Sequence, residues 1–239
     1  MNEINQLQTL IDSSHKIVFF TGAGISTESN IPDFRSADGL YQQASKIPPE
    51  TILSHTFFIN NPDDFYRFYR KNMLYLNAKP NTAHKFIADL EAKGKCLGVI
   101  TQNIDGLHQL AGSKHVCELH GSVYRNTCMI CHKTHSIKDI INTESIPLCD
   151  CGGIIKPDVT LYEEALDEAV IDDALNLITS ADLLLVCGTS LSVYPAAGFI
   201  RYFKGNSLVL LNKTTTPFDN QADLCIHDSL GNIFSQIEL

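Results

Sequence analysis

The feature that most constrains the fold is a short apolar run that ends in a glycine-rich turn. Residues 17–20, Ile-Val-Phe-Phe, are typical of a strand buried on both faces, and they lead into Gly22-Ala23-Gly24. Such a turn usually serves a dinucleotide, because glycine lets the backbone approach a pyrophosphate and the following amides face its negative charge. We therefore expect a nucleotide site at Gly22, Ala23 and Gly24.

By itself this turn also fits a tight connection that holds no ligand. The Rossmann fingerprint needs a third small residue, where Thr27 stands, and an acid about 20 residues on at the end of a second strand, which is not evident here. Residues 30–35, Asn-Ile-Pro-Asp-Phe-Arg, interrupt any helix and bring Phe34 and Arg35 near the turn. This pattern differs from an ordinary dehydrogenase and predicts a cofactor that is consumed.

Other predicted strands also end in polar side chains. Apolar runs at 96–100, 115–119, 183–187 and 208–211 alternate with helical patterns at 1–12, 62–76, 82–92, 167–179 and 230–239. The polar groups that follow these strands are Gln102, Asn103 and Asp105, then His120, then Gly188, Thr189 and Ser190, and finally Asn212. Because ligands bind at the carboxyl ends of parallel strands, we expect an α/β fold with a Rossmann-like parallel sheet and one site along this edge.

The chemistry of these polar groups suits a nicotinamide nucleotide. Gln102, Asn103 and Asp105 offer amide donors and acceptors that match a carboxamide, which nicotinamide carries. His120 has an ordinary pKa near 6.5 and could be a general base toward a sugar hydroxyl, although a lone histidine at a strand end is often structural. Asn212 lies some two dozen residues after Gly188, where a Rossmann half places its ribose-binding side chain.

Four of the eight cysteines are spaced like metal ligands. Cys128-x-x-Cys131 is followed by Cys149-x-Cys151, a pattern that can deliver four thiolates to one tetrahedral Zn²⁺. Four thiolates close the coordination shell, so we expect one structural zinc per chain. The other cysteines, at 96, 117, 187 and 225, are interpreted as small buried hydrophobic residues, and the histidines outside the site, such as those at 15, 84 and 135, indicate no second metal.

The composition of the chain argues against two classes of binding partner, nucleic acid and membranes. The 239 residues carry a formal charge of −9, which disfavours nucleic acid because phosphate binding depends on clustered lysine and arginine. No apolar stretch approaches the roughly 18 to 20 residues of a membrane span, and residues 1–12 resemble an amphipathic helix and not a signal peptide. We expect a cytoplasmic protein that does not bind membranes and is consistent with a monomer.

Taken together and in order, these motifs resemble the sirtuins, NAD-dependent protein lysine deacylases, and are similar to the short bacterial members of that family. The matching segments are Gly-Ala-Gly-Ile-Ser at 22–26, Ile-Pro-Asp-Phe-Arg at 31–35, Thr-Gln-Asn-Ile-Asp at 101–105, His-Gly at 120–121, the four cysteines, and Gly-Thr-Ser-Leu-x-Val-x-Pro-Ala-Ala at 188–197. The resemblance runs from about residue 6 to the end. It implies a Rossmann-like NAD-binding domain at 1–35, 77–123 and 156–239, and a small domain made of a helical insertion at 36–76 and a zinc-binding module at 124–155.

The resemblance also implies a reaction and residue roles. The acyl group of a lysine would pass to ADP-ribose, with release of nicotinamide and O-acetyl-ADP-ribose. The implied catalytic residues are His120, Asn103 and Asp105. The implied NAD-binding residues are Gly22, Ala23, Gly24, Ser26, Thr27, Phe34, Arg35, Gln102, Asn103, Ile104, Asp105, His120, Gly188, Thr189, Ser190, Asn212 and Leu230. Acyl-lysine proteins or peptides would bind as a strand along Val159 and Tyr162.

Three departures from the usual family pattern bear on the substrate. Tyr162-Glu163-Glu164 stands where Phe-Gly-Glu is usual, and Asn30 stands where glycine is usual, which leaves the peptide preference open. Sirtuins that remove succinyl groups carry Tyr-x-x-Arg on the helix near Tyr69, whereas residues 69–72 here are Tyr-Arg-Lys-Asn. Without that arginine a dicarboxylic acyl group lacks its charge partner, so we expect acetyl and other neutral acyl groups.

Three other functions fit parts of the sequence. A classical NAD oxidoreductase would need the missing acid and a hydride acceptor. A second possibility is a zinc-ribbon module that binds nucleic acid and senses NAD without turnover. The net negative charge of the chain argues against it, because nucleic acid is itself negatively charged. A third possibility is a sirtuin fold that transfers ADP-ribose to protein. With labelled NAD, the label would then end on protein and not on free O-acyl-ADP-ribose.

Overall fold

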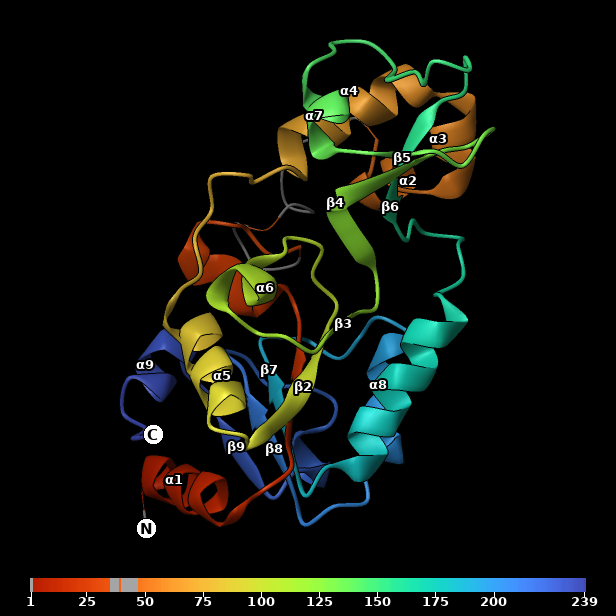
Figure 1. Cartoon of the computed structure of the whole chain (residues 1–239). Coiled ribbons are helices and arrows are strands. Elements are labelled where there is room, and N and C mark those ends of the chain that lie inside the picture. The colour runs from red at the N-terminus through yellow and green to blue at the C-terminus, as the bar shows by residue number, and fades with distance from the viewer. Residues whose placement is uncertain (1, 35–38, 40–46) are drawn as a thin grey trace.

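The largest unit of the protein is a six-stranded parallel sheet. A computed structural model describes residues 2–34, 39 and 47–239, and Figure 1 shows the arrangement of the elements. In sheet order the strands are β3 (Val116–Glu118), β2 (Cys96–Thr101), β1 (Ile17–Thr21), β7 (Leu183–Cys187), β8 (Ser207–Leu211) and β9 (Leu224–Ile226). The order reverses between β1 and β7, which is the switch point at which doubly wound folds bind nucleotides.

Helices cover both faces of this sheet. Every residue of β1 and of β7 is buried, as expected for strands with helices on each side. One apolar layer joins α1 (Glu3–Ser13), α5 (Thr82–Ala92) and α9 (Leu230–Phe234) to the face that carries Phe19 and Leu185. The other joins α8 (Glu168–Ser180) and η3 (Ala196–Tyr202) to the face of Val18 and Phe20. In Figure 1, α1, α5 and α9 lie on the opposite side of the sheet from α8.

A second unit, here called the small module, lies at the top of Figure 1. It contains the antiparallel sheet of β5 (Thr134–His135), β4 (Gly121–Cys128) and β6 (Ile155–Val159), with α2 (Pro49–Ile52), α3 (His55–Asn60), α4 (Pro62–Asn72) and α7 (Ile137–Ile141). Its core is aromatic: Phe58 packs edge-on against Phe65 with ring centroids 4.9 Å apart, and Phe65 stacks on Tyr69. Segments far apart in the sequence thus share one small core.

Among the described residues, the remaining short helices are η1 (Ala23–Ser29), α6 (Leu107–Ala111) and η4 (Asp219–Gln221). The expected C-terminal helix is shorter than predicted, because it ends at Phe234 and the tail then runs along α1. There the Gln8 side chain bonds both the amide and the carbonyl of Glu238, and Ile237 is buried, so tertiary contacts replace the last helical turn. None of the helices in the described part of the chain combines the length and apolar character needed to cross a bilayer.

Candidate active site

Two glycine turns cross at the switch point of the parallel sheet. The Gly24 amide donates to the Gly188 carbonyl over 2.8 Å, and the Gly22 amide donates to Cys187 over 3.1 Å. A Cβ on Gly24 would lie 2.8 Å from Gly188 Cα, and one on Gly188 would lie 2.5 Å from the Ile25 nitrogen. Gly188 also has φ +63°, a left-handed conformation that favours glycine. Backbone therefore packs on backbone where a pyrophosphate would bind.

The first turn continues into η1, which ends in a left-handed residue. Thr27 Oγ1 donates to the Gly24 carbonyl over 3.0 Å and tightens the turn. Asn30 closes η1 with φ 62°, a conformation that asparagine tolerates better than most residues other than glycine. Phe34 packs against the core of the small module, whereas Arg35 lies outside the described residues.

The polar cluster after β2 is bonded to the first turn. Ser26 Oγ donates to Asp105 Oδ2 over 2.6 Å, and Asn103 Nδ2 donates to Ser26 Oγ over 3.0 Å. The Leu107 amide donates to the other Asp105 oxygen over 2.9 Å. Burial raises the pKa of Asp105, and these hydrogen bonds act in the opposite direction. Asp105, Asn103 and Ser26 thus form one network, with Ile104 beside them in the chain, and the sequence did not predict the Ser26–Asp105 contact.

His120 is oriented by the same segment. Its Nδ1 lies 2.9 Å from the Gln102 carbonyl, and because a carbonyl can only accept, Nδ1 carries the proton and Nε2 the lone pair. Burial lowers the pKa of His120, with the Gln102 carbonyl acting against it, so the ring is neutral at pH 7. Gln102 Nε2 also donates to Thr189 Oγ1 over 3.0 Å, which links this cluster to the second turn.

The residues expected to hold adenosine lie beyond the second turn. Ser190 is exposed, and Asn212 follows β8 with its side-chain amide donating to the Thr214 carbonyl over 2.8 Å. Leu230 opens α9 but is only 5% exposed and belongs to the apolar layer under the sheet. The sequence analysis missed Glu28, whose carboxylate accepts from the Gly231 amide over 2.9 Å and joins η1 to α9.

The segment expected to bind substrate passes directly beside His120. The Thr160 amide donates to the His120 carbonyl over 3.0 Å. Val159 is buried in the core of the small module, whereas Tyr162 is 41% exposed and its backbone bonds Leu53 and His55. This segment is thus fixed between the histidine and the start of α3.

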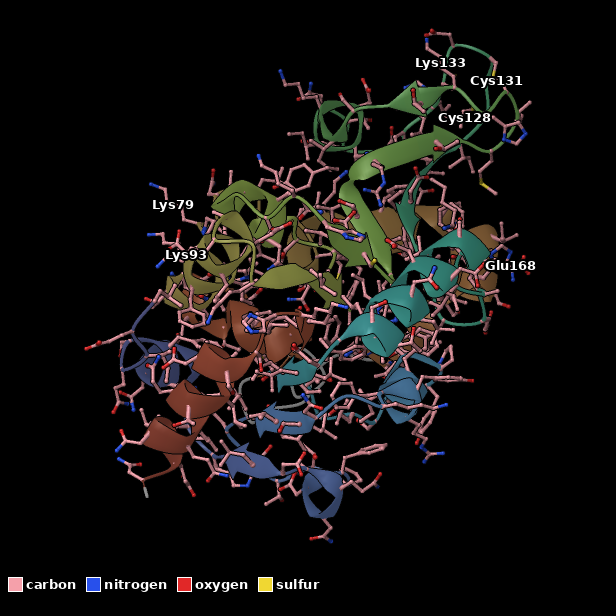
Figure 2. The ribbon with its side chains drawn as sticks, turned by 60° about the horizontal axis from the view of Figure 1, so that its bottom comes forward. Lys79, Lys93, Cys128, Cys131, Lys133 and Glu168 are labelled. Carbon is pink, nitrogen blue, oxygen red and sulfur yellow. The ribbon has the colours of Figure 1, made fainter. Side chains whose placement is uncertain are left out.

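The four cysteines converge at the tip of the small module. Figure 2 labels Cys128 and Cys131 there, beside Lys133. The Sγ atoms of Cys128 and Cys151 lie 3.4 Å apart, those of Cys131 and Cys149 lie 3.6 Å apart, and all four fall within 4.8 Å. Thiolates about 2.3 Å from a tetrahedral zinc would be about 3.8 Å apart, so the set fits Zn²⁺ with small adjustment. All four ligand positions are filled by protein, so the zinc is structural.

The chain is similar to known proteins in sequence and in fold. The sequence profile of the Sir2 family matches residues 22–195. An NAD-dependent protein deacetylase of Clostridium acetobutylicum is 56% identical and one of Staphylococcus aureus strain N315 is 48% identical, each covering 99% of this chain and 98% of its own.

Solved structures are similar over nearly the whole chain. A Sir2 protein with a deacetylated p53 peptide and 3′-O-acetyl ADP-ribose has a TM-score of 0.89 at 39% identity, covering 98% of this chain and 96% of that one. A Sir2 complex with p53 peptide and NAD⁺ has a TM-score of 0.86 at 39% identity, with the same coverage. Sir2Tm bound to a propionylated peptide has a TM-score of 0.87 at 39% identity, covering 99% and 97%.

Proposed function

The chain belongs to the Sir2 family and is an NAD-dependent protein deacetylase, and on this premise we propose which residues carry out its reaction. NAD⁺ supplies ADP-ribose as the acceptor of the acyl group, and nicotinamide and O-acetyl-ADP-ribose leave. His120 acts as the general base toward a ribose hydroxyl. The observation that supports this role is the bond from Nδ1 to the Gln102 carbonyl, which leaves Nε2 free to accept a proton at neutral pH.

The other site residues bind and orient the cofactor. Asp105 and Ile104 hold the carboxamide, and Gln102 and Asn103 order the adjoining ribose, since the network with Ser26 fixes these groups at the end of β2. The crossed turns would bind the phosphates, since their backbone leaves no room for side chains there; the residues are Gly22, Ala23, Gly24, Ser26, Thr27 and Gly188. Arg35 would be a charge partner of the phosphates, and Phe34 would shield the reactive sugar. Thr189, Ser190, Asn212 and Leu230 hold the adenosine half. Leu230 does so through backbone, because its side chain is buried.

We also propose the domain division, partners and location. The small domain comprises 36–76 and 124–155. The core shared by Phe65, Ile140 and Cys149 supports joining these two segments, and it also takes in Val159 and Leu161 from beyond residue 155. Acyl-lysine peptides bind along Val159 and Tyr162 as an added strand. The eight cysteines form no disulfide, which suits the reducing cytoplasm, and four of them hold one structural zinc. The protein acts as a monomer that binds neither nucleic acid nor membrane.

The test follows the masses of an acetyl-lysine peptide and of the NAD products. We expect deacetylation with release of nicotinamide, and a loss of about 100-fold or more in His120→Ala, because a general base contributes roughly that much. His15→Ala, at an exposed histidine outside the site, is the matched control and should retain activity. An active His120→Ala would contradict the assigned base, and label from NAD that ends on protein would indicate ADP-ribosyl transfer.

The acyl preference follows from the surroundings of α4. Arg70, the cation on that helix next to Tyr69, donates from Nε to the Ile140 carbonyl over 2.8 Å and from Nη1 to the Glu144 carbonyl over 3.2 Å. Its guanidinium is thus committed to α7 and the loop after it, and does not serve a succinyl carboxylate. We expect kcat/KM to be higher for acetyl- and propionyl-lysine than for succinyl-lysine in one peptide sequence. Faster removal of succinyl would refute this preference.

A further inference from the structure

Three potential metal ligands meet at the outer edge of the parallel sheet, away from the four cysteines. His115 directly precedes β3, Cys117 lies in it, and Asp173 lies on α8, which packs against β3. Figure 1 shows β3 and α8 on the lower unit and the zinc-binding β4 to β6 region on the upper one. The ligand atoms of the three side chains all lie within 4.8 Å of one another.

The imidazole of His115 is held in a fixed orientation. Its backbone amide donates to Glu91 over 2.8 Å, and its carbonyl accepts from the Val99 amide over 2.9 Å. Its Nδ1 lies 3.1 Å from the Leu97 carbonyl. Gly98 makes room for the ring, because a Cβ there would lie 3.1 Å from His115 Cγ. The carbonyl fixes the proton on Nδ1, which is the arrangement that orients a metal-binding histidine.

The remaining ring nitrogen and the thiol converge on one carboxylate. His115 Nε2 lies 2.9 Å from Asp173 Oδ2, and Cys117 Sγ lies 2.8 Å from the same oxygen. A carboxylate only accepts, so the Cys117 contact needs the thiol proton, and that proton lies where a cation would bind. Cys117 is 3% exposed, whereas the side chains of His115 and Asp173 are 44% and 46% exposed, so an ion can enter from solvent.

We propose that His115, Cys117 and Asp173 form a second metal site that binds a divalent ion of the Zn²⁺ or Co²⁺ class, with one position left for water. Imidazole, thiolate and carboxylate are ligands that Zn²⁺ accepts, whereas Mg²⁺ and Ca²⁺ require oxygen. Binding releases the thiol proton to solvent, and the Nε2 lone pair of the neutral imidazole binds the ion. With bonds of about 2.0 to 2.3 Å the donors would be about 3.3 to 3.5 Å apart, so the half-exposed Asp173 carboxylate must move back from His115 and Cys117 to admit the ion.

The site differs from the zinc cluster in composition and in what it would do. It has three protein ligands and an open position, so its ion should exchange, whereas the four-cysteine ion is enclosed. The bound ion would join β3 to α8 across the edge of the sheet. His120 follows β3 three residues after Cys117, but the proposed site touches none of the residues assigned to the reaction.

The test uses the full chain with its structural zinc in place and Co²⁺ as the probe. We expect one cobalt per chain in addition to the retained zinc, with the near-ultraviolet band of a cobalt–thiolate bond. Cys117→Ser should abolish that band, and His115→Gln and Asp173→Asn should weaken cobalt binding by at least about tenfold. Asp172→Asn, at the exposed neighbour on α8, and Cys225→Ser, at a half-buried thiol, are the matched controls and should bind cobalt like the wild type.

Zinc content and far-ultraviolet circular dichroism confirm that each variant is folded. Asp173→Asn keeps the test decisive if the buried Cys117→Ser does not fold, because Asp173 is half-exposed. The proposal is overturned if the wild type binds no metal beyond its one zinc, or if all three variants bind cobalt as the wild type does.

Discussion

At the scale of single residues, two of the three departures from the family pattern are explained by the backbone. Asn30 and Glu163 stand where glycine is usual in the family pattern, and both adopt left-handed conformations, with φ 62° and 75°. Asparagine tolerates this region, whereas glutamate is strained there. The Glu163 carboxylate accepts from the Thr56 amide over 2.9 Å at the start of α3, which offsets part of the strain. The two substitutions therefore preserve a glycine-like backbone.

This explanation predicts opposite preferences for alanine and glycine at two positions. Both Glu163→Ala and Glu163→Gly lose the bond to Thr56, but only alanine keeps the left-handed strain, so the glycine variant should be more stable by about 1 kcal/mol. At Asp172, an exposed position inside α8, alanine should be more stable than glycine by about 1 kcal/mol. Denaturant unfolding of the four variants measures the difference in free energy of unfolding between alanine and glycine at each position. Equal stability of the two Glu163 variants would contradict the strain.

At the scale of elements, the cofactor site depends on two strand–turn units that contact each other through backbone. Gly24 and Gly188 come from turns separated by more than half the chain, and each leaves no room for a Cβ on the other. The hydrogen bond between them joins the ends of β1 and β7 directly. A change in one turn should therefore disturb both halves of the site.

Substitution by alanine tests this crossing. Gly94→Ala adds a side chain in open space at φ +73°, so it should cost about 1 kcal/mol for the backbone conformation alone. Gly188→Ala has a similar φ, but its Cβ would press on Gly24 and Ile25, which should add about 1 to 3 kcal/mol and weaken NAD binding. Unfolding curves and calorimetric titration with NAD measure both effects. If the two variants lost the same stability and bound NAD equally, the contact of Gly188 with Gly24 and Ile25 would not be what requires glycine at position 188.

At the scale of the whole molecule, buried histidines make stability depend on pH. His84 and His108 lie beneath the site with rings 4.9 Å apart, and His108 bonds Thr21 of β1 over 3.1 Å. Burial lowers the pKa of His84 to about 4 and that of His108 well below its ordinary value. The unfolded chain binds protons at a pKa near 6.5, so acid favours unfolding.

The free energy of unfolding should therefore fall as the pH drops from about 6.5 toward 4. The shift of His84 alone corresponds to about 3 kcal/mol across that range, since one pKa unit is about 1.4 kcal/mol. Urea unfolding between pH 7.5 and 4.5 measures the slope. His84→Gln, which does not titrate, should show a shallower slope than the wild type, and an unchanged slope would refute the role of His84.

The sequence predicted those features that depend on residues close together in the chain. The buried strands at β1 and β7, the helix α5 at 82–92 and the four-cysteine pattern were all evident, because burial, helical periodicity and ligand spacing are local properties. The early end of α9 was not evident from the sequence, because the C-terminal tail bonds Gln8 at the other end of the chain.

The sequence by itself determined the fold class, the family and the chemical groups available at each strand end. Only the tertiary structure decided which of those groups meet: Ser26 with Asp105, His120 with the Gln102 carbonyl, and Cys117 and His115 with Asp173. These pairs are separated by 18 to 79 residues in the chain. Strand order and helix packing bring them together, and no local pattern encodes a contact made across that distance.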